Sequence, residues 1–354
     1  MNLPKYIEIG TGIVDQISSE LQKRTITGKM FVISDANTGP LYAGHIREVL
    51  KSSGYETEYY ELPPGELTKS MKYVQTLYDW LYSSRAERSD VLIAVGGGVI
   101  GDLVGFVAAT YMRGIKWVQV ATTLLSQVDS SIGGKVAVDL DSGKNIVGAF
   151  HPPSLSLLDI DTLTTLPDRD LSSGWAEAIK HGLILDISHF EELEANFKDP
   201  RDPSLLLSAV TQSVLIKSRV VDNDPYDQGF RAILNYGHTI AHALETATAY
   251  KQLLHGEAVS IGMVGAAAIS GELELISDKV QKRQNNLLER ALLPTTYVNI
   301  DPGIIFDAIK RDKKVSKGQP KWVLLNGIGK ATIGHDVDTR LVLRILDELQ
   351  ESRV

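Results

Sequence analysis

The first half of the chain alternates short apolar runs with stretches of helical periodicity. Apolar runs at residues 31–34, 91–95 and 117–121 end in polar or glycine residues, as buried parallel strands do. Residues 71–81 carry apolar side chains at helical spacing, and a second helix is expected over residues 103–111. The pattern predicts a doubly wound, Rossmann-like α/β domain that binds a nucleotide over residues 1–165.

The second half has a different pattern. Residues 176–185, 205–221, 238–249 and 258–273 form long segments with helical character. They predict a mainly α-helical domain over residues 166–354, with the boundary near residues 165–167. A chain of 354 residues is also too long for one hydrophobic core, which favours two domains.

Composition narrows the class of protein. The net charge of −8 argues against a nucleic-acid or anionic-membrane surface. No run reaches the roughly 20 apolar residues that a membrane span needs, and no secretory signal is visible at the amino terminus, so a cytoplasmic protein is expected. The absence of cysteine means that any metal must bind to nitrogen and oxygen ligands.

Three of the eight histidines lie close together in the sequence, at His238, His242 and His255. His238 and His242 are four residues apart and share one helix face, and His255 is followed by a glycine that lets the backbone approach an ion. Glu177 shares a helix face with Lys180 and His181 and is surrounded by apolar residues. Two histidines and a carboxylate form a metal site with an open position; the alternative is a set of ordinary core histidines and a surface ion pair.

A glycine-rich turn follows the second predicted strand: Gly96-Gly97-Gly98-Val-Ile-Gly101-Asp102. Its place between a strand and a helix suits phosphate binding at a helix amino terminus, although such a turn can also be purely structural. The turn departs from the dinucleotide fingerprint, because it lies outside the first βαβ unit and no acid follows about 20 residues later. Asp35, at the end of the first strand, is the better candidate for a ribose-binding acid.

Basic residues add a preference for an anionic substrate. Lys135 and Lys144 are flanked by glycine and apolar residues, which is typical of phosphate-binding segments. Further basic residues are Arg113, Lys217, Arg231, Lys313 and Lys314. Their number in an acidic protein predicts a substrate with several negative charges, such as a phosphate and a carboxylate.

Several motifs together resemble those of the 3-dehydroquinate synthase family. They are the glycine-rich turn, the segments at residues 121–135 and 144–150, the segment 173–180, Leu234-Asn-Tyr-Gly-His-Thr239, His255-Gly-Glu-Ala-Val259 and Asp312-Lys-Lys314. The resemblance covers nearly the whole chain. It implies an NAD- and metal-dependent lyase of the shikimate pathway that converts 3-deoxy-D-arabino-heptulosonate 7-phosphate to 3-dehydroquinate and phosphate. NAD oxidises C5, phosphate leaves, the same cofactor reduces the ketone, the ring opens, and an aldol step closes the carbocycle.

The resemblance also implies residue roles. The metal, Zn²⁺ or Co²⁺, would bind to Glu177, His238 and His255. NAD would contact Asp35, Gly65, Glu66, Lys69, Gly97, Gly98, Asp102, Thr122, Thr123, Asp129, Lys144, Thr162, Leu163, Thr164 and Thr165. The substrate phosphate would bind to Lys135, Asn145, Asn235 and His242, with Arg113 from a second subunit. The substrate carboxylate would bind to Lys217 and Arg231. The pocket would be completed by Lys180 and either Lys313 or Lys314. The family resemblance further implies a homodimer.

Three alternatives remain at this point. A cyclase acting on sedoheptulose 7-phosphate would have less use for Lys217 and Arg231, because that sugar lacks the carboxylate. A metal-dependent polyol dehydrogenase would consume NAD and would not need the phosphate-binding Lys135, Lys144 and Asn145. A non-catalytic metal-binding protein would leave the basic residues without a function.

Overall fold

The computed structural model describes residues 3–311, 315–316 and 319–351, and the chain divides into two compact units. The first, Met1–Leu166, is called the α/β unit here, and the second, Pro167–Val354, the helical unit. Each is described by itself.

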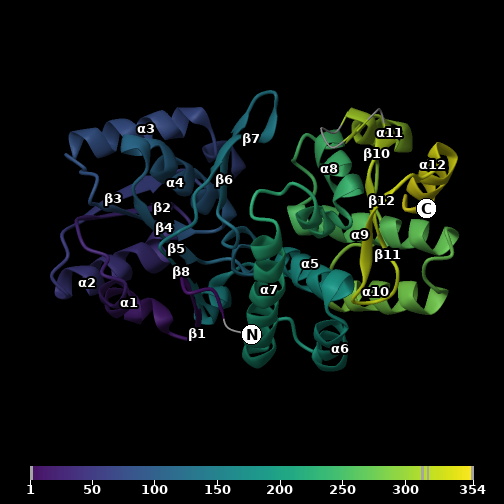
Figure 1. The fold of residues 1–354 in the computed structure, drawn as a ribbon, viewed down its shortest axis with the longest axis horizontal. Helices are drawn as coiled ribbons and strands as arrows, with labels where there is room; N and C mark the ends of the chain where they lie inside the picture. The colour runs from purple at the N-terminus through teal and green to yellow at the C-terminus, as the bar shows by residue number, and fades with distance from the viewer. Residues whose placement is uncertain (1–2, 312–314, 317–318, 352–354) are drawn as a thin grey trace. The chain divides into compact units, whose positions relative to one another are not determined.

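A six-stranded parallel sheet forms the centre of the α/β unit, with the strand order β1-β8-β5-β4-β2-β3 (Figure 1). The strands are β1 (Ile7–Gly10), β2 (Met30–Asp35), β3 (Thr57–Leu62), β4 (Val91–Gly96), β5 (Lys116–Ala121) and β8 (Leu155–Asp159). The predicted strands at 31–34, 91–95 and 117–121 correspond to β2, β4 and β5.

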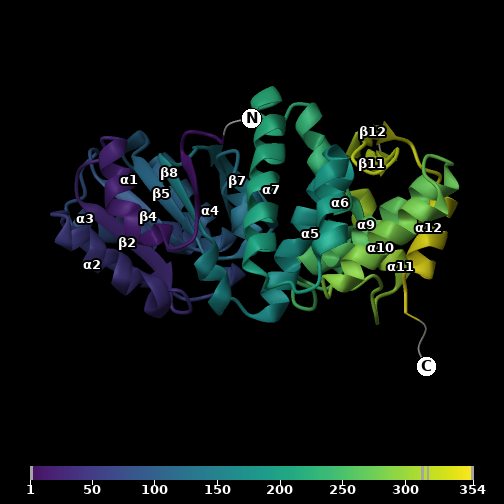
Figure 2. The same ribbon diagram turned by 90° about the horizontal axis from the view of Figure 1, so that it is seen from below.

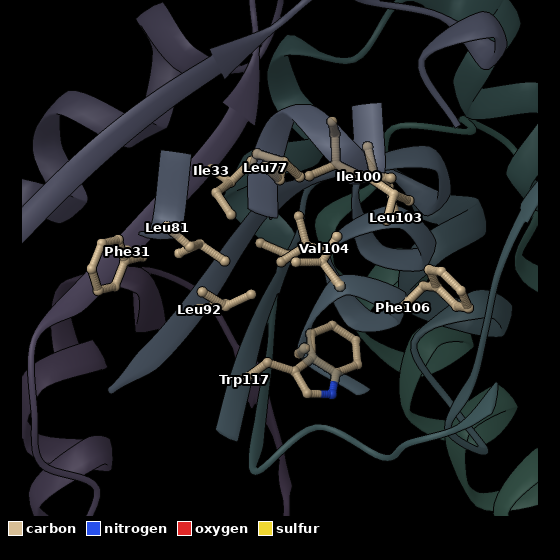
Figure 3. Packing of buried hydrophobic residues seen from close by; sticks show 14 of the residues in the cluster. Phe31, Ile33, Leu77, Leu81, Leu92, Ile100, Leu103, Val104, Phe106 and Trp117 are labelled. Atoms are coloured by element: carbon tan, nitrogen blue, oxygen red, sulfur yellow. The ribbon is translucent and has the colours of Figure 1, made fainter. Parts of the chain in front are cut away.

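Helices cover both faces of this sheet. One face carries α1 (Ile17–Lys23) and α2 (Gly44–Ser52), and the other carries α3 (Met71–Ser83) and α4 (Gly98–Thr110). Successive residues of one strand enter opposite cores: Phe31 packs with α3 and α4, whereas Val32 packs with α1 and α2. Figure 3 shows the first of these cores, with Val104 in the middle of the labelled side chains and Trp117 at their lower edge. The predicted doubly wound α/β fold is therefore confirmed.

An antiparallel hairpin that the sequence analysis did not predict packs against α4. It consists of β6 (Lys135–Leu140) and β7 (Gly143–Phe150). Val136 and Val138 of β6 are buried in the same core as α4. Gly105 permits this contact, because a β-carbon there would lie 2.4 Å from Val136 Cγ1. Lys135 lies on β6, and Lys144 and Asn145 lie on β7.

The helical unit contains the long helices that the sequence predicts, several of them longer than expected (Figure 2). They are α5 (Asp168–Leu185), α6 (Ile187–Asn196), α7 (Pro203–Asn223), α8 (His238–Ala247), α9 (His255–Glu272), α10 (Asp278–Arg290), α11 (Pro302–Arg311) and α12 (Thr339–Glu348). Helix α9 begins at His255, earlier than predicted, because the Glu257 carboxylate accepts the backbone N–H of Leu254 at 2.7 Å and caps the first turn.

Two glycines of α9 set the distances between helices. A β-carbon on Gly256 would lie 1.8 Å from the carbonyl oxygen of Ser173 in α5, and one on Gly262 would lie 2.0 Å from the carbonyl oxygen of Gly237. The Gly256 N–H also donates to Ser173 Oγ at 2.9 Å. Gly256 is therefore needed for close packing of α9 on α5.

The rest of the helical unit includes short strands that the sequence analysis did not predict. They are β9 (Val315–Ser316), β10 (Gln319–Pro320), β11 (Trp322–Leu325) and β12 (Ala331–His335), in two antiparallel pairs. Among the described helices, α7 alone has the length and composition of a membrane span, but 56% of its apolar window is buried inside the protein, so this is weak evidence for one.

Candidate active site

The glycine-rich turn of the α/β unit joins β4 to α4. Gly97 precedes the helix with an extended backbone, and a β-carbon there would lie 2.9 Å from Thr123 Cγ2. A β-carbon on Gly98 would lie 3.2 Å from Ser130 Oγ. The two glycines therefore leave space at the amino terminus of α4, where free backbone N–H groups attract phosphate.

Buried hydroxyl groups lie next to this turn. Among the residues that the structure describes, Thr122 Oγ1, Ser130 Oγ and Ser131 Oγ are buried without a hydrogen-bond partner. Buried polar atoms in proteins nearly always have a partner. The hydroxyls and the space above Gly97 and Gly98 fit the pyrophosphate of a dinucleotide, which would supply the missing acceptors.

Four of the predicted nucleotide-binding residues form ion pairs close to the same turn. Lys69 Nζ lies 2.6 Å from Asp102 Oδ2, and Lys144 Nζ lies 3.2 Å from Glu66 Oε1. Burial alone would lower the pKa of Lys69, but the carboxylates of Asp102 and Glu66 outweigh burial and raise it. Gly65, beside Glu66, has a φ of 97°, which favours glycine.

The remaining nucleotide candidates follow the ends of neighbouring strands. Asp35 ends β2, and its Oδ1 accepts the N–H groups of Asn37 and Thr38, each at 2.9 Å. The turn η6 (Ile160–Thr165), which follows β8, contains Thr162, Leu163, Thr164 and Thr165. Asp129 lies in η5 (Ser126–Ser130), after β5. Leu163 is buried. Because parallel strands end at one edge of the sheet, these segments belong to the same edge.

One buried side chain links two of these segments and was missed by the sequence analysis. Gln127 Nε2 donates to the carbonyl oxygens of Ala121 at 3.0 Å and Asp159 at 2.9 Å, which end β5 and β8. It also lies 3.2 Å from Thr162 Oγ1. The signal available in the sequence was a glutamine within the segment of residues 121–135 that also carries several hydroxyl residues.

The predicted phosphate-binding residues of the α/β unit are solvent-exposed. Lys135 begins β6, and Asn145, in β7, has a φ of 54° and donates its backbone N–H to Asp139 Oδ1 at 2.8 Å. Arg113 ends the turn η4 (Tyr111–Arg113) with a φ of 67°. The role predicted for Arg113 depends on a second subunit.

In the helical unit, Glu177, His238 and His255 come together from α5, α8 and α9. One ligand atom of each lies within 4.8 Å of the others. Glu177 Oε1 is 3.4 Å from His238 Nε2 and 3.6 Å from His255 Nε2. This is a donor set of two imidazoles and one carboxylate, which suits Zn²⁺ or Co²⁺.

The Glu177 carboxylate is fully buried. Burial acts to raise its pKa, but the ammonium group of Lys180 and the imidazole of His255 outweigh burial and hold the pKa well below its ordinary value. Among the described residues, neither carboxylate oxygen has a hydrogen-bond partner, although Lys180 is in ion-pair contact with Oε2. A charged, buried carboxylate with unused acceptor capacity fits a metal ligand.

Hydrogen bonds orient both imidazole rings. His238 Nδ1 lies 3.1 Å from the carbonyl oxygen of Tyr236, which can only accept, so Nδ1 carries the proton and Nε2 carries a lone pair. His255 Nδ1 lies 3.0 Å from Glu245 Oε1. Burial acts to lower the pKa of His255, but the carboxylates of Glu177 and Glu245 raise it to about 10, which shows that this point favours positive charge.

The predicted substrate residues of the helical unit lie on the elements around this trio. Lys180 is buried in α5, Lys217 is buried in α7, and Arg231 is buried in η7 (Phe230–Asn235), which packs on both helices. Asn235 ends η7, and the ring of His242 lies 5.4 Å from that of His238. Lys313 and Lys314 lie outside the described residues. Buried cations in this number suit an anionic ligand.

Sequence comparisons agree with this geometry. Two family descriptions match consecutive segments: "3-dehydroquinate synthase N-terminal" at residues 59–173 and "3-dehydroquinate synthase C-terminal" at residues 174–315. The chain is 42% identical to the 3-dehydroquinate synthase of Nostoc punctiforme, over 98% of both chains. It is 44% identical to that of Thermoanaerobacter pseudethanolicus, over 90% of both chains.

Solved structures with the same fold include a 2-deoxy-scyllo-inosose synthase complexed with carbaglucose-6-phosphate, NAD⁺ and Co²⁺. Its TM-score is 0.88, and it is 28% identical in sequence, with 97% of this chain and 96% of that chain covered. A 2-epi-5-epi-valiolone synthase from Streptomyces hygroscopicus with NAD⁺ and Zn²⁺ bound has a TM-score of 0.89 and 26% identity over 99% and 97%. A butanol dehydrogenase from Thermotoga maritima, at 16% identity and a TM-score of 0.70, shares the fold alone.

The fold and these relatives define an enzyme of the sugar-phosphate cyclase class. Within that class, the chain belongs to the 3-dehydroquinate synthase family.

Proposed function

We propose that this protein converts 3-deoxy-D-arabino-heptulosonate 7-phosphate to 3-dehydroquinate and phosphate, a step of aromatic biosynthesis. The observation that carries the proposal is the trio of Glu177, His238 and His255 with the buried bases Lys217 and Arg231 in the same unit. The relatives at 42% and 44% identity bear the name of this activity.

The two units have separate roles in this proposal. The α/β unit binds NAD at the edge of its sheet, through the turns after β2, β4, β5 and β8 and the pairs around Lys69 and Asp102. The helical unit holds a divalent cation, Zn²⁺ or Co²⁺, on Glu177, His238 and His255. When bound, the cation acidifies the C5 hydroxyl and NAD accepts and returns a hydride.

The protein's own residues bind and orient the substrate. Lys217 and Arg231 pair with its carboxylate, and Arg231 is suited to this because its planar guanidinium matches a carboxylate in two-point contact. The substrate phosphate binds to Lys135, Asn145, Asn235 and His242, and the second subunit of a homodimer contributes Arg113. Lys180 keeps Glu177 ionised. The leaving phosphate takes the proton during elimination, so no separate base is required.

The substrate distinguishes this function from that of another cyclase. Sedoheptulose 7-phosphate has no carboxylate, so an enzyme acting on it would have less use for the buried cations Lys217 and Arg231. The buried pair therefore favours the sugar acid. A polyol dehydrogenase is disfavoured for a different reason, because it would not need the phosphate-binding residues Lys135, Lys144 and Asn145.

The test is phosphate release by metal-loaded protein with substoichiometric NAD, using the heptulosonate phosphate and sedoheptulose 7-phosphate side by side. We expect many turnovers per NAD on the sugar acid only, with dehydroquinate as the product. Turnover of sedoheptulose 7-phosphate instead would contradict the roles of Lys217 and Arg231. Stoichiometric NADH would indicate a dehydrogenase.

The oligomeric state and location complete the proposal. We expect a cytoplasmic homodimer, and light scattering after size-exclusion chromatography measures the mass. A monomer with full activity would exclude a role for Arg113 of a second subunit. Arg113→Ala in a dimer should raise KM for the substrate and leave NAD affinity unchanged.

A further inference from the structure

The His255 ring lies between two carboxylates. Its Nε2 faces Glu177 Oε1 at 3.6 Å, and its Nδ1 contacts Glu245 Oε1 at 3.0 Å. Glu245 is buried, with 6% of its surface exposed. It lies on α8 with His238 and His242, at helical spacing from both, so one helix supplies a proposed metal ligand and the outer partner of another.

The two imidazoles of the site are held differently. His238 Nδ1 is held by a main-chain carbonyl, that of Tyr236, which no substitution removes. His255 Nδ1 is held by a side chain that reaches across from α8 to the first residue of α9. The position of His255 therefore depends on a replaceable group.

We propose that Glu245 is a positioning residue for the metal centre, acting through His255. This inference rests on the proposed function only in assuming that Glu177, His238 and His255 bind the cation. The carboxylate of Glu245 accepts the Nδ1–H of His255, which leaves the lone pair on Nε2 and directs it to the point that Glu177 Oε1 and His238 Nε2 face.

Charge and geometry support the same role. A hydrogen-bonded carboxylate makes an imidazole a stronger electron donor, and it fixes the rotation of the ring. A second buried carboxylate near the site also lowers the electrostatic cost of placing a divalent cation beside the ammonium group of Lys180. Glu245 touches neither the substrate nor the cation in this arrangement, so it is not a catalytic residue.

A purely structural role makes a different prediction. If the Glu245–His255 contact only joined α8 to α9, its loss would lower the melting temperature and would leave the affinity for metal unchanged. Metal affinity measured without substrate therefore separates the two roles.

The experiment compares wild type, Glu245→Gln, Glu245→Asp and the control Glu194→Gln as full-length apoproteins at one pH. Glutamine keeps the size of Glu245 but removes its charge, and aspartate keeps the charge but shortens the reach. Glu194 is also a partly buried glutamate of the helical unit, but it lies on α6, which carries none of the trio, and it pairs with Arg283, with 2.6 Å between Oε2 and Nη2. Affinity for Zn²⁺ and Co²⁺ is measured by competition with a chromophoric chelator, and the visible spectrum of bound Co²⁺ reports its coordination.

We expect Glu245→Gln to weaken metal binding by about 10–100-fold, the usual effect of losing an outer partner of a ligating histidine, and to change the Co²⁺ spectrum. Glu245→Asp should lose less, and Glu194→Gln should bind metal as wild type does. Binding by Glu245→Gln within about threefold of wild type, with an unchanged spectrum, overturns the proposal whatever its melting temperature. If Glu245→Gln does not fold, an affinity of Glu245→Asp equal to wild type overturns it as well.

Failure of the proposed function is distinguishable from failure of this inference. If the wild-type protein binds metal through His255 but does not release phosphate from the heptulosonate phosphate, the proposed function is wrong. The role of Glu245 is then unaffected. Wild-type metal binding that is unaffected by His255→Ala overturns both.

Discussion

The two units build their candidate sites in different ways. In the α/β unit, the residues assigned to NAD lie mainly on turns at the ends of parallel strands, and the groups they offer are backbone N–H groups, hydroxyls and a few ion pairs. In the helical unit, the assigned residues are charged or imidazole side chains buried on the faces of packed helices. The first site follows from the topology of the sheet, whereas the second depends on the packing of side chains.

The difference has an energetic consequence. Buried charges such as Glu177, Lys180, Lys217 and Arg231 cost free energy unless they are paired, and a hydrophobic core would be more stable. Groups with strongly shifted pKa values concentrate at functional sites for this reason. Substitutions in the helical unit should therefore change chemistry most, and those in the α/β unit should change nucleotide binding and local stability.

The largest effect is expected for His255→Ala. Loss of one of three ligands should abolish tight metal binding and lower turnover by about a thousandfold or more, which corresponds to several kcal/mol of transition-state stabilisation. NAD affinity should stay within about twofold, since the nucleotide residues belong to the other unit. Metal analysis, phosphate release and NAD titration measure the three quantities. His335→Ala, a matched change on β12, should alter none of them, and turnover by metal-depleted His255→Ala at the wild-type rate would refute the assignment.

A smaller effect, on stability and NAD affinity together, is expected for Gln127→Met. The side chains have similar volumes, but methionine cannot donate to the carbonyl oxygens of Ala121 and Asp159, so about 1–3 kcal/mol of stability should be lost. Hydrogen exchange should rise at the ends of β5 and β8, and NAD should bind more weakly, with metal affinity unchanged. The same substitution at the exposed Gln75 of α3 is the control. Normal exchange in Gln127→Met would show that Gln127 does not hold these strand ends.

Gly97→Ala tests the turn itself. Its β-carbon would lie 2.9 Å from Thr123 Cγ2 and would fill space that the pyrophosphate needs, so NAD affinity should fall by about tenfold. Gly44→Ala is the control, because a β-carbon at Gly44 meets nothing within 4 Å. Equal NAD affinity in the two variants would place the nucleotide elsewhere.

The smallest effect concerns the Glu194–Arg283 pair, which is partly exposed. The Arg283 guanidinium lowers the pKa of Glu194 below its ordinary value of 4.5. The pair therefore stabilises the folded state above pH 4.5, and its contribution is lost as the pH falls through the lowered pKa. Glu194→Gln should cost less than about 1 kcal/mol at pH 7 and nothing well below the lowered pKa, as urea unfolding at several pH values would show. A larger loss at low pH than at pH 7 would contradict this sign.

Some elements could not be read from the hydrophobic pattern. The β6–β7 hairpin was missed because its strands lack a clean alternation of apolar and polar residues. Strand β7 contains glycines and exposed apolar residues, and strand β6 is buried only on the side that packs on α4. The pairs β9–β10 and β11–β12 were missed because strands of two to five residues carry too few positions to show a period. Helices α5 and α9 began earlier than predicted, because their first turns depend on capping and charged residues and not on apolar spacing.

The α/β fold of the first half, the helical character of the second, the restriction to nitrogen and oxygen ligands, and the family could all be predicted from the sequence, because they depend on local pattern and residue type. The convergence of Glu177, His238 and His255, and the contact of Glu245 with His255, became visible in the folded protein. Those residues lie on three helices, and their distances are set by backbone contacts at Gly256 and Gly262. Such contacts join segments far apart in the chain, and no local pattern encodes the distance between two packed helices.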